Sequence, residues 1–244
     1  MQRLIDGAAA LGICLTTKQR AAFQLYYQEL VAWNQQFNLT AITDYEQVQI
    51  RHFLDSLSCL LAEEVRQVLN RPDARVIDVG TGAGFPGLPL KLVCPGFYLT
   101  LLEATGKKVT FLDHLIGQLN LQKVIAIKSR AEELAHDPSH REQYDLALAR
   151  AVGELPVVVE YTLPFCRIGG SVVAQKGEAG AAESWSASQA ITLLGGELSR
   201  VMSVELPGLP EDRSLVVIKK IGSTPPSYPR RPGIPSKKPL GKRG

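Results

Sequence analysis

The chain has 244 residues, which is enough for one α/β domain with a small appendage but too short for two domains of ordinary size. Hydrophobic residues make up 45% and charged residues 21%, a balance that excludes a disordered chain and predicts one buried core. No apolar run reaches the ~20 residues of a membrane span, and four scattered cysteines form no zinc-ligand pattern, so we expect a protein of the reducing cytoplasm with no signal peptide, membrane contact or metal.

Basic residues gather at the C-terminal end. Eight of the 27 lysines and arginines lie after residue 218 and all 24 acids lie before it, so residues 1–218 carry a net charge of −5. Six prolines in the same segment lack a backbone donor and fix φ, and we therefore expect residues 223–244 to be an extended, weakly structured arm whose removal spares the core. The arm could bind nucleic-acid phosphates, or it could only aid solubility. Its candidate phosphate ligands are Arg230, Arg231, Lys237 and Lys238.

Two helices are predicted before the core. Apolar residues at helical spacing follow Thr16 and Thr17, which can cap a helix. A second periodic stretch carries its apolar face from Ile50 to Leu61. We assign residues 1–70 to an N-terminal helical cap.

From residue 75, short apolar runs alternate with helical stretches, which indicates βαβ units and a parallel sheet. Residues 196–206 and 214–219 are predicted to form a hairpin that adds an antiparallel strand at one side of the sheet. We therefore expect residues 71–222 to form a doubly wound, Rossmann-like α/β core with a mostly parallel sheet. Five parallel strands are expected, at residues 75–79, 98–102, 124–128, 146–149 and 171–174.

A glycine-rich turn follows the first predicted strand and precedes a helix, a place where a ligand can approach the backbone. Gly82-x-Gly84-x-x-Gly87 fits the dinucleotide fingerprint, whereas Asp78-x-Gly80-x-Gly82-x-Gly84 fits the form used by S-adenosylmethionine-dependent methyltransferases. The second form agrees better with the strand, because Gly80 is the first glycine after it. Asp78 could then orient the loop amides or accept from the methionine ammonium.

Polar residues stand at the ends of the next three strands. Glu103 ends the second strand, where a carboxylate can accept both ribose hydroxyls of an adenosine, although a solvated strand-end acid is the alternative. The turn at residues 129–133 could contact the adenine edge, or its acids could simply suit a first helical turn. Arg150 ends the fourth strand, at the sheet edge where doubly wound folds bind ligands. An ordered series at successive strand ends favours one cofactor site.

These residues resemble the ribosomal RNA small subunit methyltransferase G family, also called glucose-inhibited division protein B. The similarity runs over nearly the whole chain. It is most specific where a helix with His-Phe-Leu-Asp-Ser accompanies a Gly-Phe-Pro-Gly turn. It is carried by Asn38-Leu39-Thr40, Arg51-His52-Phe53-Leu54-Asp55-Ser56, Asp78-Val79-Gly80-Thr81-Gly82-Ala83-Gly84-Phe85-Pro86-Gly87, Gly106-Lys107-Lys108, Ser129-Arg130-Ala131-Glu132, Ala149-Arg150-Ala151, Lys176-Gly177, Arg213-Ser214-Leu215-Val216-Val217-Ile218 and Tyr228-Pro229-Arg230-Arg231-Pro232-Gly233.

The resemblance implies that S-adenosylmethionine donates a methyl group to guanine N7 in the decoding region of 16S ribosomal RNA. It also places cofactor contacts on Gly80, Phe85, Glu103, Ala131, Glu132 and Arg150. This chain has Glu103 where Asp is commoner and Ala149 where some members have Ser, and we expect neither change to alter the activity. Together with Asp78, Gly82 and Gly84, these residues form the predicted cofactor site.

Guanine N7 carries a lone pair and no proton, so its methylation needs no general base. We accordingly assign no catalytic acid or base, and expect positioning, which can be worth ~7–11 kcal/mol, to supply most of the rate. Arg51 and His52 are candidates for RNA contact, although Arg51 and Asp55 at i and i+4 could equally form a solvated helical ion pair. Lys176 could meet a phosphate or be a surface lysine.

Three other functions are open from the sequence. They are a small-molecule methyltransferase of the same fold, a non-catalytic RNA-binding module, and a nicotinamide-dependent dehydrogenase. A small-molecule methyltransferase would have no use for the basic tail. We expect a monomer whose partner is 16S ribosomal RNA or the small ribosomal subunit.

Overall fold

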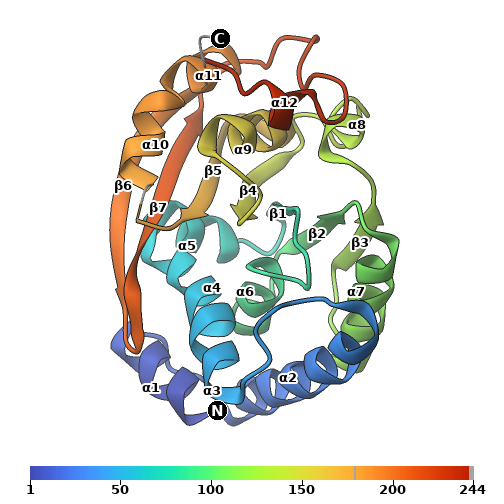
Figure 1. Cartoon of the computed structure of the whole chain (residues 1–244), viewed down its shortest axis with the longest axis vertical. Helices are drawn as coiled ribbons and strands as arrows, with labels where there is room; N and C mark the ends of the chain where they lie inside the picture. The colour runs from blue at the N-terminus through green and yellow to red at the C-terminus, as the bar shows by residue number, and fades with distance from the viewer. Residues whose placement is uncertain (179, 242–244) are drawn as a thin grey trace.

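The computed structural model describes residues 1–178 and 180–241. One seven-stranded sheet runs through the molecule in the order β3-β2-β1-β4-β5-β7-β6 (Figure 1). The first five strands pair in parallel, whereas β7 runs antiparallel to both β5 and β6, which confirms the predicted fold class and its C-terminal hairpin. The strands are β1 (Arg75–Val79), β2 (Tyr98–Glu103), β3 (Val124–Lys128), β4 (Tyr144–Arg150), β5 (Cys166–Lys176), β6 (Gly196–Leu206) and β7 (Leu209–Lys220).

The strand order reverses at β1. The chain builds β2 and β3 on one side of β1 and then returns to place β4 and β5 on the other. At such a switch point the loops after neighbouring strands diverge and leave a crevice outside the carboxyl ends of the strands. The ends of β1, β2, β3 and β4 are therefore brought to one edge.

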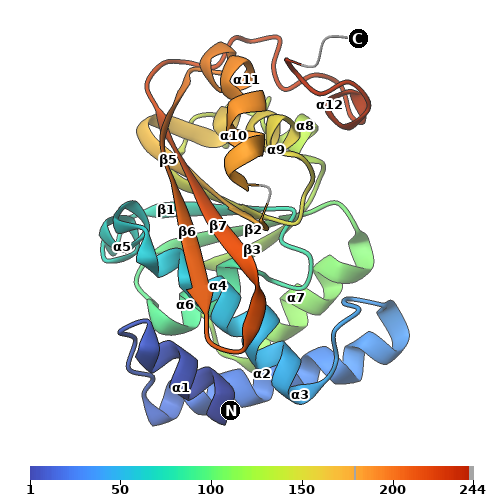
Figure 2. The same ribbon diagram turned by 60° about the vertical axis from the view of Figure 1, so that its left-hand side comes forward.

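Helices cover both faces of this sheet. Figure 2 shows α2, α6 and α7 on one side and α8, α9 and α11 on the other. Alternate residues of a strand point to opposite layers, so Val76 of β1 packs with the first group and Ile77 with the second. The helices are α1 (Gln2–Ala10), α2 (Thr17–Phe37), α3 (Tyr45–Val48), α4 (Asp55–Leu57), α5 (Glu63–Leu69), α6 (Gly87–Val93), α7 (Gly106–Gln118), α8 (Ala131–Leu134), α9 (Leu155–Thr162), α10 (Gly180–Ser186), α11 (Ser188–Leu193) and α12 (Ile234–Lys237).

The N-terminal helices belong to the same core as the sheet. Phe23, Tyr26 and Leu30 of α2 are fully buried against it, and Thr16 caps α2 through a reciprocal hydrogen-bond pair with Gln19. The prediction missed α1. The second predicted helix is also not continuous, because a π-helical turn (Gln49–Leu54) lies between α3 and α4.

The prediction of a weakly structured C-terminal arm is wrong for the described part of the tail. Residues 223–241 lie over α8 and α9 and include α12 (Figure 1). The prolines lack backbone N–H donors, but every residue of the tail keeps its backbone carbonyl as an acceptor. The Arg141 guanidinium donates to the carbonyls of Thr224, Pro225 and Tyr228. Side chains of the core thus supply the hydrogen bonds that a regular element would supply. Lys242 and Arg243 lie outside the described residues.

No helix among the described residues has both the length and the apolar character needed to cross a membrane.

Candidate active site

The loop between β1 and α6 has backbone conformations that favour glycine. Gly80, Gly82 and Gly84 have φ of +70°, +62° and +104°. A Cβ on Gly80 would lie 3.0 Å from a methyl of Val152, and one on Gly84 would lie 2.6 Å from the Tyr26 hydroxyl. The loop therefore has no room for a side chain at Gly80 or Gly84, whereas the space beside Gly82 is open.

Asp78 is completely buried at the end of β1, beneath this loop. Its Oδ2 accepts hydrogen bonds from the Thr81 hydroxyl at 2.6 Å and from the Gly87 N–H at 2.7 Å, so one oxygen ties both ends of the loop. Burial raises the pKa of Asp78 to about 6, although these two hydrogen bonds act to lower it. Its Oδ1 has no hydrogen-bond partner within the described residues. The contacts support the loop-ordering role, and a contact with the methionine ammonium stays a prediction.

A small cavity of about 120 Å³ opens beside the loop. The Glu103 carboxylate accepts hydrogen bonds from the N–H groups of Gly82, at 3.0 Å, and Thr105, at 2.8 Å. Each oxygen keeps a lone pair for a further donor, as a ribose hydroxyl would require. The Glu103 carboxylate beside the glycine loop is thus consistent with the predicted ribose contact, which stays a prediction. The cavity is lined by Val79, Gly80, Leu102, Glu103, Ala104, Ser129, Arg130, Ala131, Glu132, Val152 and Tyr161.

Phe85 does not line this cavity. It packs next to the glycine loop, against residues of other elements. Its ring stacks on Tyr26 at 5.3 Å and on His52 at 4.6 Å, measured between ring centroids. The Arg150 guanidinium carbon lies 5.0 Å from the centroid of the same ring. Phe85 is 5% exposed, so in this structure it links the glycine loop to the π-helical turn and to Arg150.

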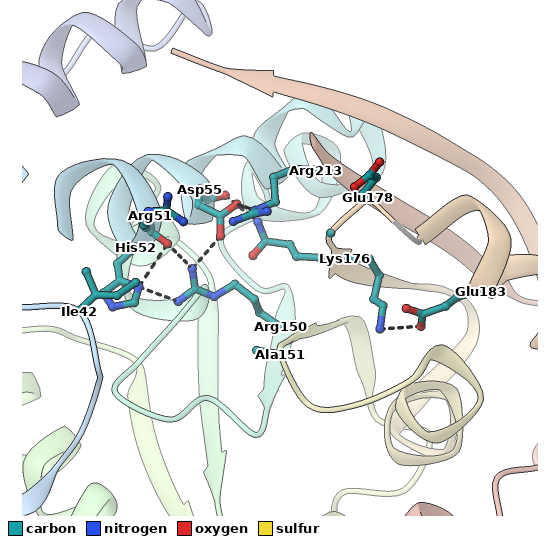
Figure 3. A pocket seen from close by; sticks show the side chains of 12 residues that line it. Ile42, Arg51, His52, Asp55, Arg150, Ala151, Lys176, Glu178, Glu183 and Arg213 are labelled. Carbon is teal, nitrogen blue, oxygen red and sulfur yellow. Dashed lines mark hydrogen bonds and ion pairs between the residues drawn. The ribbon is translucent and has the colours of Figure 1, made fainter. Parts of the chain in front are cut away.

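A larger cavity of about 480 Å³ lies next to Arg150, between the π-helical turn and the ends of β4 and β5 (Figure 3). The Asp55 carboxylate receives a hydrogen bond from Arg150 Nη1 at 2.8 Å and lies 3.5 Å from Arg213 Nε. Arg150 also donates to the backbone carbonyl of Arg51. Most of the residues that line the cavity are charged or polar. The lining residues are Ile42, Arg51, His52, Asp55, Arg150, Ala151, Gln175, Lys176, Gly177, Glu178, Glu183 and Arg213.

The expected ion pair between Arg51 and Asp55 is not formed. The π-helical turn shifts the spacing of side chains from that of an α-helix, so the two residues do not meet on one face. Arg51 instead pairs with Glu211 at 2.8 Å, whereas Asp55 faces Arg150 and Arg213. The local helical pattern thus indicated the wrong partner for each.

His52 is held as a neutral ring. Burial lowers its pKa to about 3, and the neighbouring Arg150 charge lowers it further than burial alone would. The ring Nε2 and the Thr40 hydroxyl oxygen lie 2.8 Å apart, and Arg150 Nη2 lies 3.4 Å from Nδ1. A base with so low a pKa accepts few protons near neutral pH.

Lys176 borders the cavity but is already engaged. Its ammonium lies 2.7 Å from Glu183 Oε2 and donates to the Gly153 carbonyl at 2.6 Å. Figure 3 shows this pair across the cavity from Arg150. A phosphate at Lys176 would have to compete with Glu183.

Comparison with known proteins identifies the family. Residues 19–216 match the family described as GidB, rRNA small subunit methyltransferase G. The chain belongs to the rRNA small subunit methyltransferase G family. Ribosomal RNA small subunit methyltransferase G of Dehalococcoides mccartyi is 48% identical over 240 residues, 98% of this chain and 100% of the relative. The proteins of the same name from Roseiflexus castenholzii and Pelotomaculum thermopropionicum are 48% and 46% identical, covering 98% and 96% of this chain and 100% and 96% of the relatives.

Solved structures with low sequence identity agree on the fold of this rRNA small subunit methyltransferase G family member. A SAM dependent methyltransferase from Aquifex aeolicus has a TM-score of 0.54 at 16% identity and covers 74% of this chain and 96% of its own. TrmN from Thermus thermophilus has a TM-score of 0.51 at 19% identity, covering 71% of this chain and 53% of its own. These similarities show the class I methyltransferase fold.

In this family member the predicted cofactor residues divide between two neighbouring places. The small cavity collects Gly80, Glu103, Ala131 and Glu132, whereas Arg150 lines the larger one. Gly82, Gly84 and Asp78 shape the loop between them, and Phe85 supports it.

The predicted RNA-binding residues are more dispersed. Arg51, His52 and Lys176 line the larger cavity, while Arg231, Lys237 and Lys238 are exposed on the tail. Arg230 is different, because its Nη2 lies 2.6 Å from a carboxylate oxygen of Glu160, whose side chain is completely buried. This pairing gives Arg230 an intramolecular partner in place of the free charge that the sequence suggested.

Sequence reasoning missed several residues of the site. Arg213 and Gln175 line the larger cavity from β7 and β5, and Tyr26 of α2 donates to the Ala83 carbonyl at 2.6 Å. Arg213 begins a recognisable apolar segment that also carries the family resemblance, and either signal could have marked it as a site residue. Nothing local marks Tyr26. Among the described residues, no three His, Cys, Asp or Glu side chains gather to hold a metal ion.

Proposed function

We propose that this chain transfers a methyl group from S-adenosylmethionine to N7 of a guanine in the decoding region of 16S ribosomal RNA. The names of its relatives support ribosomal RNA of the small subunit as the substrate. The observation that carries the proposal is a cavity of about 480 Å³, lined mainly by charged and polar residues, close to the glycine loop. Ala151 lines this cavity and the next residue, Val152, lines the smaller one. A base in the larger cavity would lie beside a cofactor in the smaller one.

The cofactor supplies an electrophilic methyl group when it is bound. The chain's residues bind and orient the two reactants: the glycine loop admits the cofactor closely, Glu103 accepts from its ribose, and Phe85 with His52 supports the wall between the cavities. His52, with a pKa of about 3, is unsuited to proton abstraction, and attack by the N7 lone pair requires none. This agreement favours N7 over an exocyclic amine as the methyl acceptor.

Two buried acceptors support guanine as the base. Asp55 Oδ1 and Gln175 Oε1 are buried oxygens of two residues that line the larger cavity, and neither accepts a hydrogen bond in the described structure. Asp55 Oδ1 does lie 3.5 Å from Arg213 Nε, as an ion pair. Guanine presents N1–H and N2–H donors on its Watson–Crick edge, the edge by which extruded bases are usually read. A guanine that presents this edge to Asp55 and Gln175 would leave N7 on the opposite side of the base.

The phosphate backbone would be held by cations around this cavity and on the tail. Arg51 and Lys176 stand at the cavity, and Arg231, Lys237 and Lys238 are exposed. Phosphate contacts of this kind position a nucleic acid and weaken with salt. The proposed protein acts as a monomer in the cytoplasm.

Transfer of labelled methyl from S-adenosylmethionine to isolated small ribosomal subunits, followed by nucleoside analysis, tests the function. We expect 7-methylguanosine from 16S RNA and none from large subunits. Cofactor binding without transfer to either RNA would instead favour the small-molecule methyltransferase. Label in another nucleoside would overturn the assignment of N7.

A further inference from the structure

The C-terminal tail forms contacts with two residues that line the adenosine cavity. The Gly233 N–H donates to Glu132 Oε1 at 2.9 Å, and the hydroxyl oxygens of Ser236 and Tyr161 lie 2.9 Å apart. Glu132 and Tyr161 are only 3% and 8% exposed, and both line the cavity that we assign to the adenosine. The tail therefore lies directly behind the wall of the cofactor site.

A buried ion pair fixes the tail in this place. Arg230 donates to the Glu160 carboxylate through its backbone N–H at 2.8 Å, Nε at 2.9 Å and Nη2 at 2.6 Å. These hydrogen bonds raise the pKa of Arg230, and the Glu160 side chain has no exposure to solvent. Glu160 and Tyr161 are neighbours on α9, so the ion pair and the cavity wall share one short helix.

Further contacts extend along the same segment. His136 donates to the Pro229 carbonyl at 2.8 Å, and Glu142 accepts from the Thr224 N–H at 2.7 Å. The tail is therefore held at several points along its length. The contact with the Glu142 carboxylate is the stronger kind, because its acceptor is charged. A solvated arm would make none of these contacts.

We infer that residues 224–237 are a positioning element of the S-adenosylmethionine site, which hold Glu132 and Tyr161 in the conformation that binds the adenosine. The inference rests on the proposed cofactor site but not on the RNA substrate. Arg230 is thus a positioning residue that acts on the cofactor through Glu160 and α9. The exposed cations of the same segment remain available for RNA.

Adjacent arginines provide a matched pair for the test. Arg230→Gln removes the charge from the buried pair, whereas Arg231→Gln removes the same charge from an exposed side chain one residue away. Calorimetric titration of each full-length variant with S-adenosylmethionine should show affinity reduced about tenfold for Arg230→Gln and unchanged for Arg231→Gln. Arg230→Lys should recover part of the loss, because it keeps the charge but not the forked contact.

A second variant acts without touching the ion pair. Gly233 has φ of +81°, so Gly233→Ala strains the turn that directs its N–H at Glu132, although no described atom would meet the new Cβ within 4 Å. We expect a similar loss of cofactor affinity with the Arg230–Glu160 pair intact. Gly233→Ala therefore decides the matter if Arg230→Gln does not fold.

Kinetics separate positioning from general loosening of the fold. With small subunits as methyl acceptor, Arg230→Gln should raise the KM for S-adenosylmethionine and keep its kcat at saturating cofactor. Wild-type cofactor affinity in both folded Arg230→Gln and Gly233→Ala would overturn the inference, as would an equal loss in Arg231→Gln. Failure of the wild type to methylate RNA would overturn the proposed function. It would leave the inference about the tail standing, since the cofactor titrations do not use RNA.

Discussion

Asp78 and His52 show how burial sets the charge of individual side chains at this site. Both are buried close to Arg150, but burial disfavours the charged form of each, so it raises the pKa of the acid and lowers that of the base. The result is an acid with a pKa of about 6 and an imidazole with a pKa of about 3. The low pKa makes His52 a poor proton acceptor at neutral pH, whereas Asp78 is ionised there but is buried beneath the glycine loop and lines neither cavity. Methylation at N7 requires no proton acceptor.

Stability against pH should reveal the neutral His52. Its folded pKa of about 3 lies below the unfolded value of 6.5, so the unfolded chain binds more protons between these values and stability falls as pH falls through that window. Asp78 acts in the opposite sense between 3.8 and about 6, because its folded pKa is raised. Urea unfolding of the wild type and His52→Gln between pH 4 and 6 isolates the histidine. We expect the wild type to lose about 1.4 kcal/mol more per pH unit than the variant. Equal slopes of stability against pH in the two proteins would show that folding does not lower the pKa of His52.

Two glycines of the loop should respond differently to substitution. Gly80→Val should abolish cofactor binding, since φ is +70° there and the new side chain would meet Val152. Gly82→Ala has a similar φ of +62°, but no described atom lies within 4 Å of the methyl group that it would add, so a smaller loss, about 1 kcal/mol, is expected. Calorimetric titration with S-adenosylmethionine compares them. Unchanged affinity in folded Gly80→Val would reject this placement of the site.

At the scale of elements, α2 is the part of the N-terminal region that supports the glycine loop. Tyr26 is fully buried, stacks on Phe85 and donates to the Ala83 carbonyl within the loop. The π-helical turn brings His52 to stack on the same phenyl ring. The N-terminal helices thus help to build the cofactor crevice as well as covering the sheet.

Removal of one hydroxyl tests this support. Tyr26→Phe should lower the free energy of unfolding by about 1–3 kcal/mol, because a buried carbonyl loses its donor. Tyr27→Phe is the control, since its hydroxyl makes only a solvent-exposed bond of 3.3 Å to the Thr43 carbonyl, and it should stay within about 0.5 kcal/mol of the wild type. Urea unfolding measures both. A similar effect in the two variants would assign no special support to Tyr26.

At the scale of the whole molecule, the basic tail combines two properties that the charge pattern alone could not separate. Arg230 is paired with a buried acid, whereas Arg231, Lys237 and Lys238 are exposed. Truncation of the tail would remove the buried ion pair and the contacts to Glu132 together with the exposed charges. Substitution of the exposed cations alone is therefore the cleaner test of RNA binding.

The triple variant Arg231→Gln, Lys237→Gln, Lys238→Gln should keep cofactor affinity and bind small subunits less tightly. If all three cations contact phosphate, the log–log slope of affinity against salt becomes shallower by about two units. Binding measured from low to moderate salt gives that slope for both proteins. An identical slope would mean that the tail cations are solvated and that RNA is held around the larger cavity.

Local patterns in the sequence were enough to predict the sheet, the glycine loop and the series of polar residues at strand ends. Hydrophobic periodicity and turn composition are local, and strand-end positions of a doubly wound sheet converge whatever covers them, so Glu103, Ala131 and Arg150 could be placed near one edge. The partners of Asp55 and Arg230, in contrast, depend on tertiary contacts. A π-helical turn redirects Asp55, and Glu160 lies 70 residues before Arg230 in the chain, so neither contact leaves a local pattern. The proline-rich tail was misjudged for the same reason, because its hydrogen bonds come from side chains of distant elements and not from its own backbone.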